Sequence, residues 1–456
     1  MRRRHVCFTM WKYLVGINMQ EYFRELSQKI FAFLSAEETL LLNLEGESSD
    51  FVRLNHNRVR QAGHVNQQVL AMTLVARQRQ SIATLDLVLD LRADLDQAGK
   101  LLSVLREQLS YLPEDPYINF NNDPCFSEFL GTNNLPPTFE ALDEVIQEAS
   151  GLDLVGIWAS GEVNNGFANS LGQFNWHSNY NFSLDWSIYT NADKAVKQNY
   201  AGTRWDSNIV QQKINFARDT LPLLKASPKT INPGYYQAYF APSALNELTE
   251  LLSWGGFGIK SHRTAHTPLL KMIEEGKTLH SKINFVENHQ SGLKPQFTQS
   301  GFMKPEQVTL IDNGVYQDCL VDARSAGEYS VAVNCDVERP QALTIAAGDL
   351  SENRILSELG TGIYISDLWY CNYSDRNNCR ITGMTRFACL WVEAGKVVAP
   401  LDVMRFDDSI YHILGDKLVA LTKAQEQIVD TASYEKRSQS CALLPGALVA
   451  DFHLTL

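Results

Sequence analysis

The chain has 456 residues, of which 45% are hydrophobic and 20% are charged. This balance is typical of a folded globular protein with a sizeable core, and the length predicts two large domains or three smaller ones. The formal net charge of −12 argues against a nucleic-acid-binding surface, because clustered Lys and Arg side chains supply most of the affinity for phosphate backbones.

The N-terminal residues 1–37 are predicted to be an extension followed by a helix. The first residues, Met-Arg-Arg-Arg-His, resemble the start of a signal peptide, but Lys12 interrupts the next apolar run and no small-residue cleavage site follows. Met19 is therefore an alternative start. The eight cysteines are scattered without a Cys-x-x-Cys pair, which predicts reduced thiols. No apolar stretch reaches the roughly 18 residues of a membrane span, so we expect a cytoplasmic protein.

Residues 38–232 are predicted to form an N-terminal α+β domain of strands and long helices. Leucines at helical spacing predict a helix over 87–109, and a Pro- and Asn-rich surface connection follows at 113–124. The alternating aromatic and polar residues at 174–189 are typical of an antiparallel meander. The other predicted strands cover 39–45, 69–77, 81–85 and 152–159, and the other helices cover 138–149 and 208–224.

Residues 233–456 are predicted to form a mainly antiparallel β domain. The boundary is placed at 228–234, where Pro233-Gly234 is a turn dipeptide. Beyond it the chain consists of short β-like segments with Gly turns. A helical run at 244–252 ends in the octapeptide LLSWGGFG at 251–258.

His262 and His266 have the spacing with which the helix of zinc peptidases holds its metal. However, Arg263 replaces the glutamate that would act as general base. Thr267 precedes Pro268, which disfavours a helix before it and suits a helix over 268–273. We therefore predict that both histidines lie on a loop without a metal.

Two further patterns predict no site. The run GGFGIKS at 255–261 resembles a phosphate-binding loop, but Ile259 separates the last glycine from Lys260-Ser261. Asp407 and Asp408 are adjacent in a predicted strand, so they point to opposite faces and cannot cooperate. Together with Asp402 they are expected to be solvated charges.

Several motifs occur in an order that resembles the TldD/PmbA family of zinc-dependent peptidases and DNA gyrase modulators. The resemblance covers roughly residues 38–456. Its motifs are RLNHNRVRQ at 53–61, FANSLG at 167–172, GYYQAYFAPS at 234–243, LIDNGVYQDCL at 310–320, RSA at 324–326, GIYI at 362–365, TGMTR at 382–386 and GKVVAP at 395–400.

The resemblance implies a degenerate metal site. In TldD-type members a His-Glu-x-x-x-His motif follows the helical Leu-Leu pair, whereas the corresponding positions here are Ser253, Trp254 and Gly258. TldD-type enzymes also carry a zinc-binding cysteine in a Gly-x-Cys-Gly-Lys context near the C-terminus. Cys441 lies at a similar distance from the end, but its context is RSQSCALLP at 437–445. It is expected to be a buried structural thiol.

We therefore interpret the chain as a PmbA (TldE)-like subunit that carries no cofactor and no catalytic residues of its own. By resemblance, zinc would belong to a TldD-like partner, and the pair, or a homodimer, would process extended peptides without contacting nucleic acid or membrane. Trp254 would either face the shared cavity or fill the core behind the glycine turn. Two alternatives stay open: an active metallopeptidase with displaced ligands His262, His266 and Cys441, and a stand-alone peptide- or protein-binding module of the gyrase-modulator kind.

Overall fold

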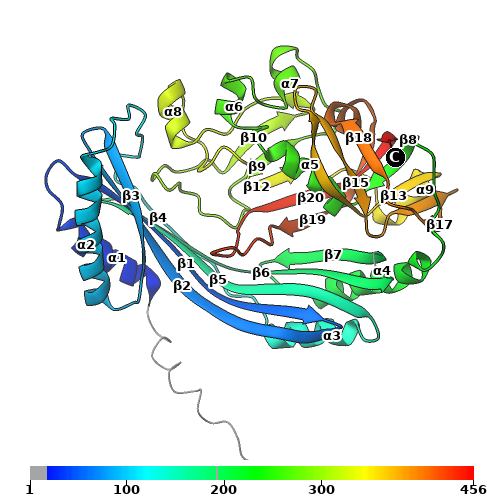
Figure 1. Ribbon diagram of the computed structural model, residues 1–456, viewed down its shortest axis with the longest axis horizontal. Helices are drawn as coiled ribbons and strands as arrows, with labels where there is room; N and C mark the ends of the chain where they lie inside the picture. Colours follow the sequence, from blue (N-terminus) through cyan, green and yellow to red (C-terminus); the bar gives the residue numbers. More distant parts are fainter. Residues whose placement is uncertain (1–17, 192–193, 456) are drawn as a thin grey trace, which may run out of the picture.

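The computed structural model describes residues 18–191 and 194–455, so the first part of the predicted N-terminal extension lies outside the described residues. Two β-sheets organise the molecule, and the concave face of the first sheet is turned toward the C-terminal unit (Figure 1). The α+β class and the β-rich C-terminal region predicted from the sequence are confirmed. Within the described part of the chain, no helix is long and apolar enough to cross a membrane.

The first sheet has the strand order β3-β2-β1-β5-β6-β4, and β7 also pairs with β6. Its pairs are antiparallel except for β4 with β6. The strands are β1 (Thr39–Asn55), β2 (Arg58–Ala76), β3 (Arg79–Asp86), β4 (Phe126–Leu130), β5 (Asp153–Asn169), β6 (Phe174–Asn191) and β7 (Lys194–Gly202).

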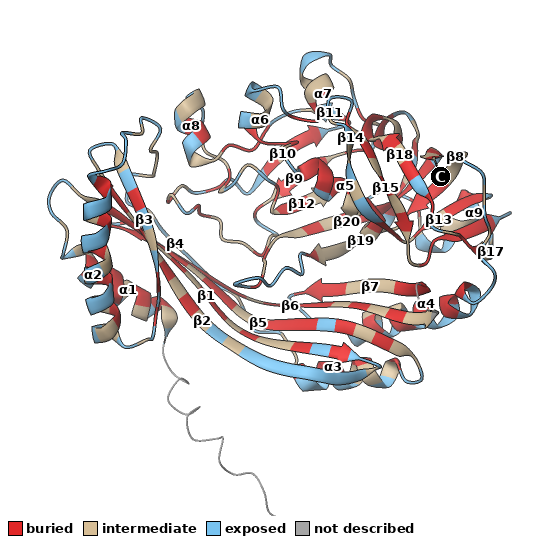
Figure 2. Ribbon diagram, viewed as in Figure 1, coloured by how far each residue is buried: buried red, intermediate tan, exposed pale blue. Residues whose placement is uncertain are grey.

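The predicted meander at 174–189 is wrong, because these residues form the single long strand β6. The alternation of aromatic and polar residues along this strand has another cause. Phe182, Leu184 and Trp186 are among the buried residues of this strand, but so are Asn179 and Asn181, which lie under the C-terminal unit. Both faces of β6 are therefore covered, as Figure 2 shows by the red colour along this strand.

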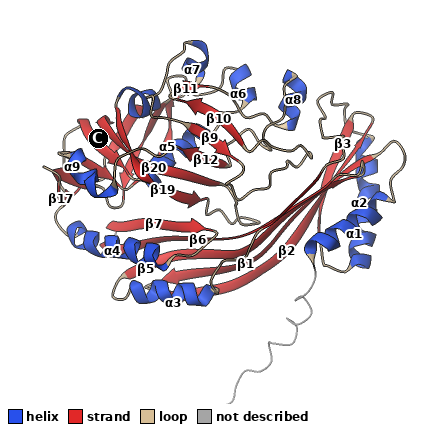
Figure 3. Cartoon of the chain, turned by 180° about the vertical axis from the view of Figure 1, so that it is seen from behind, coloured by secondary structure: helices blue, strands red, loops and turns tan. Residues whose placement is uncertain are grey.

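Among the described residues, four helices cover the first sheet. Figure 3 shows α1 (Met19–Phe31) and α2 (Leu91–Leu109) at one end, and α3 (Thr138–Glu148) and α4 (Ser207–Leu224) at the other. The prediction for α2 began four residues too early, at 87. Asp94 explains the difference, since its carboxylate accepts the N–H groups of Val88 and Leu89 and holds them outside the helix that Asp90 caps.

In the part of the chain that the structure describes, the second sheet has 13 strands, with the main order β11-β10-β9-β12-β20-β8-β13-β16-β17. Most pairs are antiparallel, while β12 with β20 and β8 with β13 are parallel. The strands are β8 (Gly234–Phe240), β9 (Phe285–Asn288), β10 (Gln307–Asp312), β11 (Val315–Tyr316), β12 (Ala342–Ile345), β13 (Gly362–Ile365), β14 (Asp367–Asp375), β15 (Arg380–Arg386), β16 (Leu390–Glu393), β17 (Lys396–Pro400), β18 (Arg405–Ser409), β19 (Leu418–Val429) and β20 (Cys441–Leu454).

Short helices join these strands. Helix α5 is buried in the largest apolar core, which also holds Phe240, Phe285, Phe406 and Phe452. The predicted helix at 268–273 appears two residues later as α7. The helices are α5 (Pro242–Ser253), α6 (Ile259–Arg263), α7 (Leu270–Glu274), α8 (Ala323–Tyr329), α9 (Ile355–Leu359), the 3₁₀ helix Glu352–Arg354 and the π-helix His412–Asp416.

Candidate functional site

The turn after α5 occupies the position at which the resembled peptidases carry their metal ligands. Helix α5 starts with Pro242, a residue that suits the first turn, and it extends the predicted run 244–252 slightly at both ends. The helix stops because Gly255 adopts a φ of +77°. A Cβ atom at Gly256 would lie 2.1 Å from the carbonyl oxygen of Leu252, so the chain turns closely around the helix end.

None of the three motif positions presents a metal ligand. Ser253 is 2% exposed, and Gly258 has no side chain. A Cβ atom at Gly258 would lie 2.5 Å from Oε2 of Glu338, and this carboxylate accepts the N–H of Lys260 at 3.0 Å. The space that a histidine side chain would need is therefore filled by Glu338. The residues present do not fit the zinc ion that the resemblance implies for TldD-type members.

Trp254 lies on the surface, so the interpretation in which it fills the core is wrong. Its side chain is 58% exposed because it caps the helix at the point where the backbone leaves it. Arg376 holds this turn by donating to the carbonyl oxygens of Trp254 and His266, at 2.9 and 2.8 Å. The guanidinium carbon also lies 5.6 Å from the centroid of the Trp254 ring.

The two histidines do not form a pair. His262 lies in α6, which corrects the prediction of a loop. The Glu338 carboxylate accepts the N–H of Lys260 in the first turn of this short helix. The Nε2 atom of His262 is 2.7 Å from the carbonyl oxygen of Gly256, its Nδ1 atom is 3.2 Å from the Tyr316 hydroxyl, and burial lowers its pKa. His266 follows the helix on an exposed loop, with Nδ1 3.1 Å from the Thr264 hydroxyl.

Cys441 is the first residue of β20 and pairs with Ala342 of β12 and Val429 of β19. Burial raises the pKa of its thiol to about 11, which keeps it protonated near neutral pH. Across residues 18–191 and 194–455, no three His, Cys, Asp or Glu side chains gather closely enough to hold a metal ion. The structure thus does not bring His262, His266 and Cys441 together.

The aspartates proposed as solvated charges behave differently from one another. Asp407 forms an ion pair with Arg380. Asp402 accepts a hydrogen bond from the Thr230 hydroxyl, with 2.6 Å between the two oxygen atoms. Asp408 is not solvated, which corrects the expectation. It is 4% exposed, lies 2.9 Å from Nδ1 of His412 and accepts the backbone N–H of His453 at 3.0 Å, because its strand face turns into the core.

A partly buried charge cluster at the junction of the two units was not predicted. Asp185 of β6 lies 3.3 Å from Nζ of Lys197 on β7. Asp367, the first residue of β14, is 6% exposed, and burial raises its pKa to about 7. Lys197 opposes this shift, whereas Glu247 of α5 and Asp185 add to it. The pKa of Glu247 is also raised by burial. The cluster therefore joins four elements of both units.

A cleft of about 670 Å³ lies between the concave face of the first sheet and the C-terminal unit. This volume is within the usual range for ligand-binding sites. Strands β1, β2, β3 and β5 form one wall, and residues from 294–299 and 430–439 form much of the other. The charged residues that line the cleft are Glu45, Glu47, Asp86, Lys294, Asp336, Asp430, Glu435, Lys436 and Arg437.

The loop between β19 and β20, residues 430–440, enters this cleft and is called the tongue here (Figure 1). Arg437 is 6% exposed and donates to the backbone oxygen and Oδ1 of Asn181, both at 3.0 Å, and to the carbonyl oxygen of Gly161 at 3.1 Å. Lys436 forms an ion pair with Glu45. The tongue therefore ties the C-terminal unit to the concave face.

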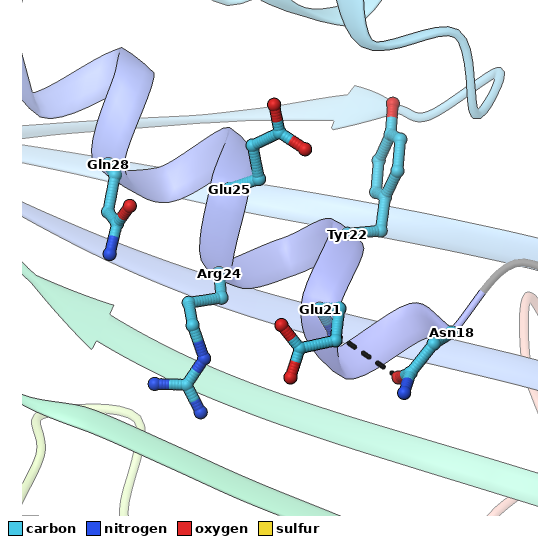
Figure 4. Close-up of a pocket in the computed structure, with 6 residues that line it drawn as sticks. All are labelled: Asn18, Glu21, Tyr22, Arg24, Glu25 and Gln28. Atoms are coloured by element: carbon cyan, nitrogen blue, oxygen red, sulfur yellow. Dashed lines mark hydrogen bonds between the residues drawn. The ribbon is translucent and has the colours of Figure 1, made fainter.

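A smaller hollow of about 350 Å³ lies beside α1, and Figure 4 shows that its six lining residues come from this helix and its N-cap. Asn18 accepts the N–H of Glu21, and Arg24 stacks 4.0 Å above the Phe174 ring. These side chains cap or cover the helix. They do not converge on a common point, so the larger cleft is the better candidate for a binding site.

The comparisons agree with this architecture. Residues 233–455 match the model of the PmbA/TldA metallopeptidase C-terminal domain. The second unit of the chain is therefore a C-terminal domain of the PmbA/TldD type. No curated protein sequence matches it.

Solved structures share the fold of nearly the whole chain. A proposed modulator of a DNA gyrase from Thermotoga maritima and TldE from Thermococcus kodakarensis each have a TM-score of 0.74 at 15% identity, covering 95% of this chain and 100% of theirs. A proposed modulator of DNA gyrase from Bacteroides thetaiotaomicron has a TM-score of 0.69 at 13% identity, covering 95% of this chain and 98% of its own. At these identities the likeness concerns the fold.

Proposed function

We propose that this chain is a TldE-like, non-catalytic subunit that pairs with a TldD-like chain, or with a second copy of itself, in the processing of extended peptides. The observation that carries the proposal is the turn after α5. Ser253, Trp254 and Gly258 offer neither an imidazole nor a carboxylate, and Glu338 fills the space beside Gly258. In this family fold, such a chain can still bind a partner and position a peptide main chain.

An exposed aromatic surface around Trp254 supports a partner role. Trp254 is 58% exposed and lies beside Arg376. A second exposed aromatic pair on β14, Trp369 and Tyr370, is 45% and 72% exposed and lies beside Arg386. Arg386 stacks 3.6 Å from the centroid of the Trp369 ring. Neither arginine forms an ion pair with another described residue, so no described carboxylate neutralises their charges. Trp, Tyr and Arg side chains dominate the binding energy of protein interfaces.

The metal content of the purified full chain tests the proposed lack of a metal site. We expect no stoichiometric zinc after dialysis and no peptide cleavage by the chain alone. About one zinc per chain would contradict the proposal, as would peptidase activity that a chelator removes. If such activity were lost in the His262→Ala, His266→Ala double variant, the alternative with displaced ligands would be correct.

The aromatic surface is tested by Trp254→Ala. Because Trp254 is largely exposed, the change is expected to alter the free energy of unfolding by less than about 1 kcal/mol while weakening self-association or association with a TldD-type chain. Tyr111→Ala is the matched control, since Tyr111 is 81% exposed and lies at the end of α2. Sedimentation or light scattering measures the assembly. A wild-type chain that stays monomeric at micromolar concentration with and without the partner would contradict the pairing.

A further inference from the structure

Three acidic residues lie on the concave wall of the cleft. Glu45 and Glu47 are two residues apart on β1, so they share one face of the strand. The strand register places Glu45 opposite Val69 of β2, and Val69 opposite Asp86 of β3. Asp86 therefore extends the same face across the sheet, and all three residues line the cleft. We call Glu45, Glu47 and Asp86 the acidic strip.

Glu47 is a buried carboxylate with hydrogen-bonding capacity to spare. It is 4% exposed, and its Oε1 atom accepts from Nε2 of Gln67 at 2.6 Å. Its Oε2 atom has no hydrogen-bond partner among the described residues. An unpaired buried acceptor costs free energy, and a charged acceptor costs more than a neutral one. A cationic donor that enters the cleft would meet this need.

The tongue already places basic side chains against the acidic strip. Its Lys436 pairs with Glu45. Burial lowers the pKa of Arg437 to about 10, and the nearby Glu47 carboxylate opposes this shift. Gln67, beside the strip, donates to the main-chain carbonyl of Glu435 at 2.7 Å. The wall thus already holds consecutive basic side chains and a main-chain carbonyl group of the tongue.

The remaining charges of the cleft favour a second cation over an anion. Lys436 and Arg437 face Glu45 and Glu47. Burial lowers the pKa of Lys294, and the Asp336 carboxylate partly offsets this shift, so Lys294 also has an acidic counterpart. Three acids that line the cleft, Asp86, Asp430 and Glu435, have no such basic counterpart among the described lining residues. The net charge of −12 adds long-range attraction for basic ligands.

We propose that the cleft binds an extended peptide segment rich in Lys or Arg beside the tongue, with Glu47 and Asp86 as its anionic contacts. This inference deepens the proposed function, because it names the class of peptide that the subunit would position. It rests on the proposed function only in taking a peptide as the ligand. The partner and the metal play no part in it.

The test uses the full chain alone and two fluorescein-labelled octapeptides of alternating Lys and Ser or alternating Glu and Ser. Fluorescence anisotropy should show binding of the Lys peptide that weakens at high salt, and no binding of the Glu peptide. Glu47→Gln and Asp86→Asn should each weaken binding roughly tenfold, as expected for the loss of a hydrogen bond to a charged group. Glu107→Gln, an exposed acid on α2, is the control and should bind as the wild type does.

Equal binding of both peptides would overturn the inference, as would variants of the acidic strip that bind like the control. Spermidine that competes at concentrations below those of the unlabelled Lys peptide would indicate a polyamine site instead. Asp86 is exposed, so Asp86→Asn keeps the test valid if Glu47→Gln fails to fold.

Partner association is measured separately on the same variants. A chain that pairs but ignores the Lys peptide contradicts this inference alone, and one that binds the peptide but never pairs contradicts the proposed pairing alone.

Discussion

Asp367 is a carboxylic acid that the fold keeps near the midpoint of its titration at neutral pH. It starts β14, the strand that carries Trp369 and Tyr370, and it faces Glu247 of α5 and Asp185 and Lys197 of the first sheet. Burial is the largest cause of its raised pKa of about 7. The charge state at this junction therefore changes within the physiological range.

The direction in which pH changes the stability follows from the pKa values of Asp367 in the unfolded and folded chain. Between the ordinary value of 3.8 and about 7, Asp367 is ionised in the unfolded chain but protonated in the folded one. The folded state thus binds more protons, and its stability falls as pH rises through this window. Glu247, whose pKa is also raised, adds a slope of the same sign.

Asp367→Asn is expected to stabilise the protein more at pH 8 than at pH 5, because an amide has no ionisation penalty. The full difference is on the order of a few kcal/mol and is reached above pH 7. Urea unfolding at pH 5, 6.5 and 8 measures it, with the exposed acid variant Glu306→Gln as control. A constant offset between wild type and Asp367→Asn across this range would show that Asp367 does not titrate as inferred.

At the scale of elements, local patterns predicted the long helices and four strands of the first sheet, but not their lengths, and they did not resolve the separate strands of the second sheet. Strand β5 was predicted to end at 159 and continues to Asn169, through a stretch rich in Gly and Asn. These residues usually weaken a strand. Here Gly166 is needed because a Cβ atom would lie 2.6 Å from the Phe23 ring of α1, and at Gly161 it would lie 2.1 Å from the carbonyl oxygen of Ser48. Only the packed structure reveals these close approaches.

The turn after α5 shows the same limit of sequence-based prediction for the candidate site. The sequence could indicate that Ser253, Trp254 and Gly258 replace metal ligands, since this depends on residue type alone. It could not decide where Trp254 points, because Arg376, 122 positions away, holds its backbone. Nor could it indicate that Glu338 fills the space beside Gly258. Long-range contacts decide both points.

At the scale of the whole molecule, the cleft exists because the long curved first sheet packs against the C-terminal unit, and the tongue of this unit extends to the sheet. Its walls come from segments near residues 45, 67, 86, 164, 297 and 435, which no local pattern connects. The two units also share buried polar contacts. Asn179 donates to the carbonyl oxygen of Leu293, and Lys194 donates to that of Leu401 at 2.9 Å. The junction is therefore bonded at several places along β6 and β7.

Arg437 is expected to be the most important single residue of this junction. Its guanidinium is buried and donates to two oxygens of Asn181 and one of Gly161, so Arg437→Gln leaves these acceptors without a charged donor. We expect a loss of roughly 3 kcal/mol in the free energy of unfolding and faster amide exchange in β5 and β6.

Lys436→Gln is the matched control on the same tongue. Its ion pair with Glu45 is partly exposed, with side-chain exposures of 53% and 34%, and should contribute about 1 kcal/mol or less. Urea unfolding and hydrogen exchange measure both variants. Equal, small losses would mean that the tongue rests on the sheet without holding the two units together.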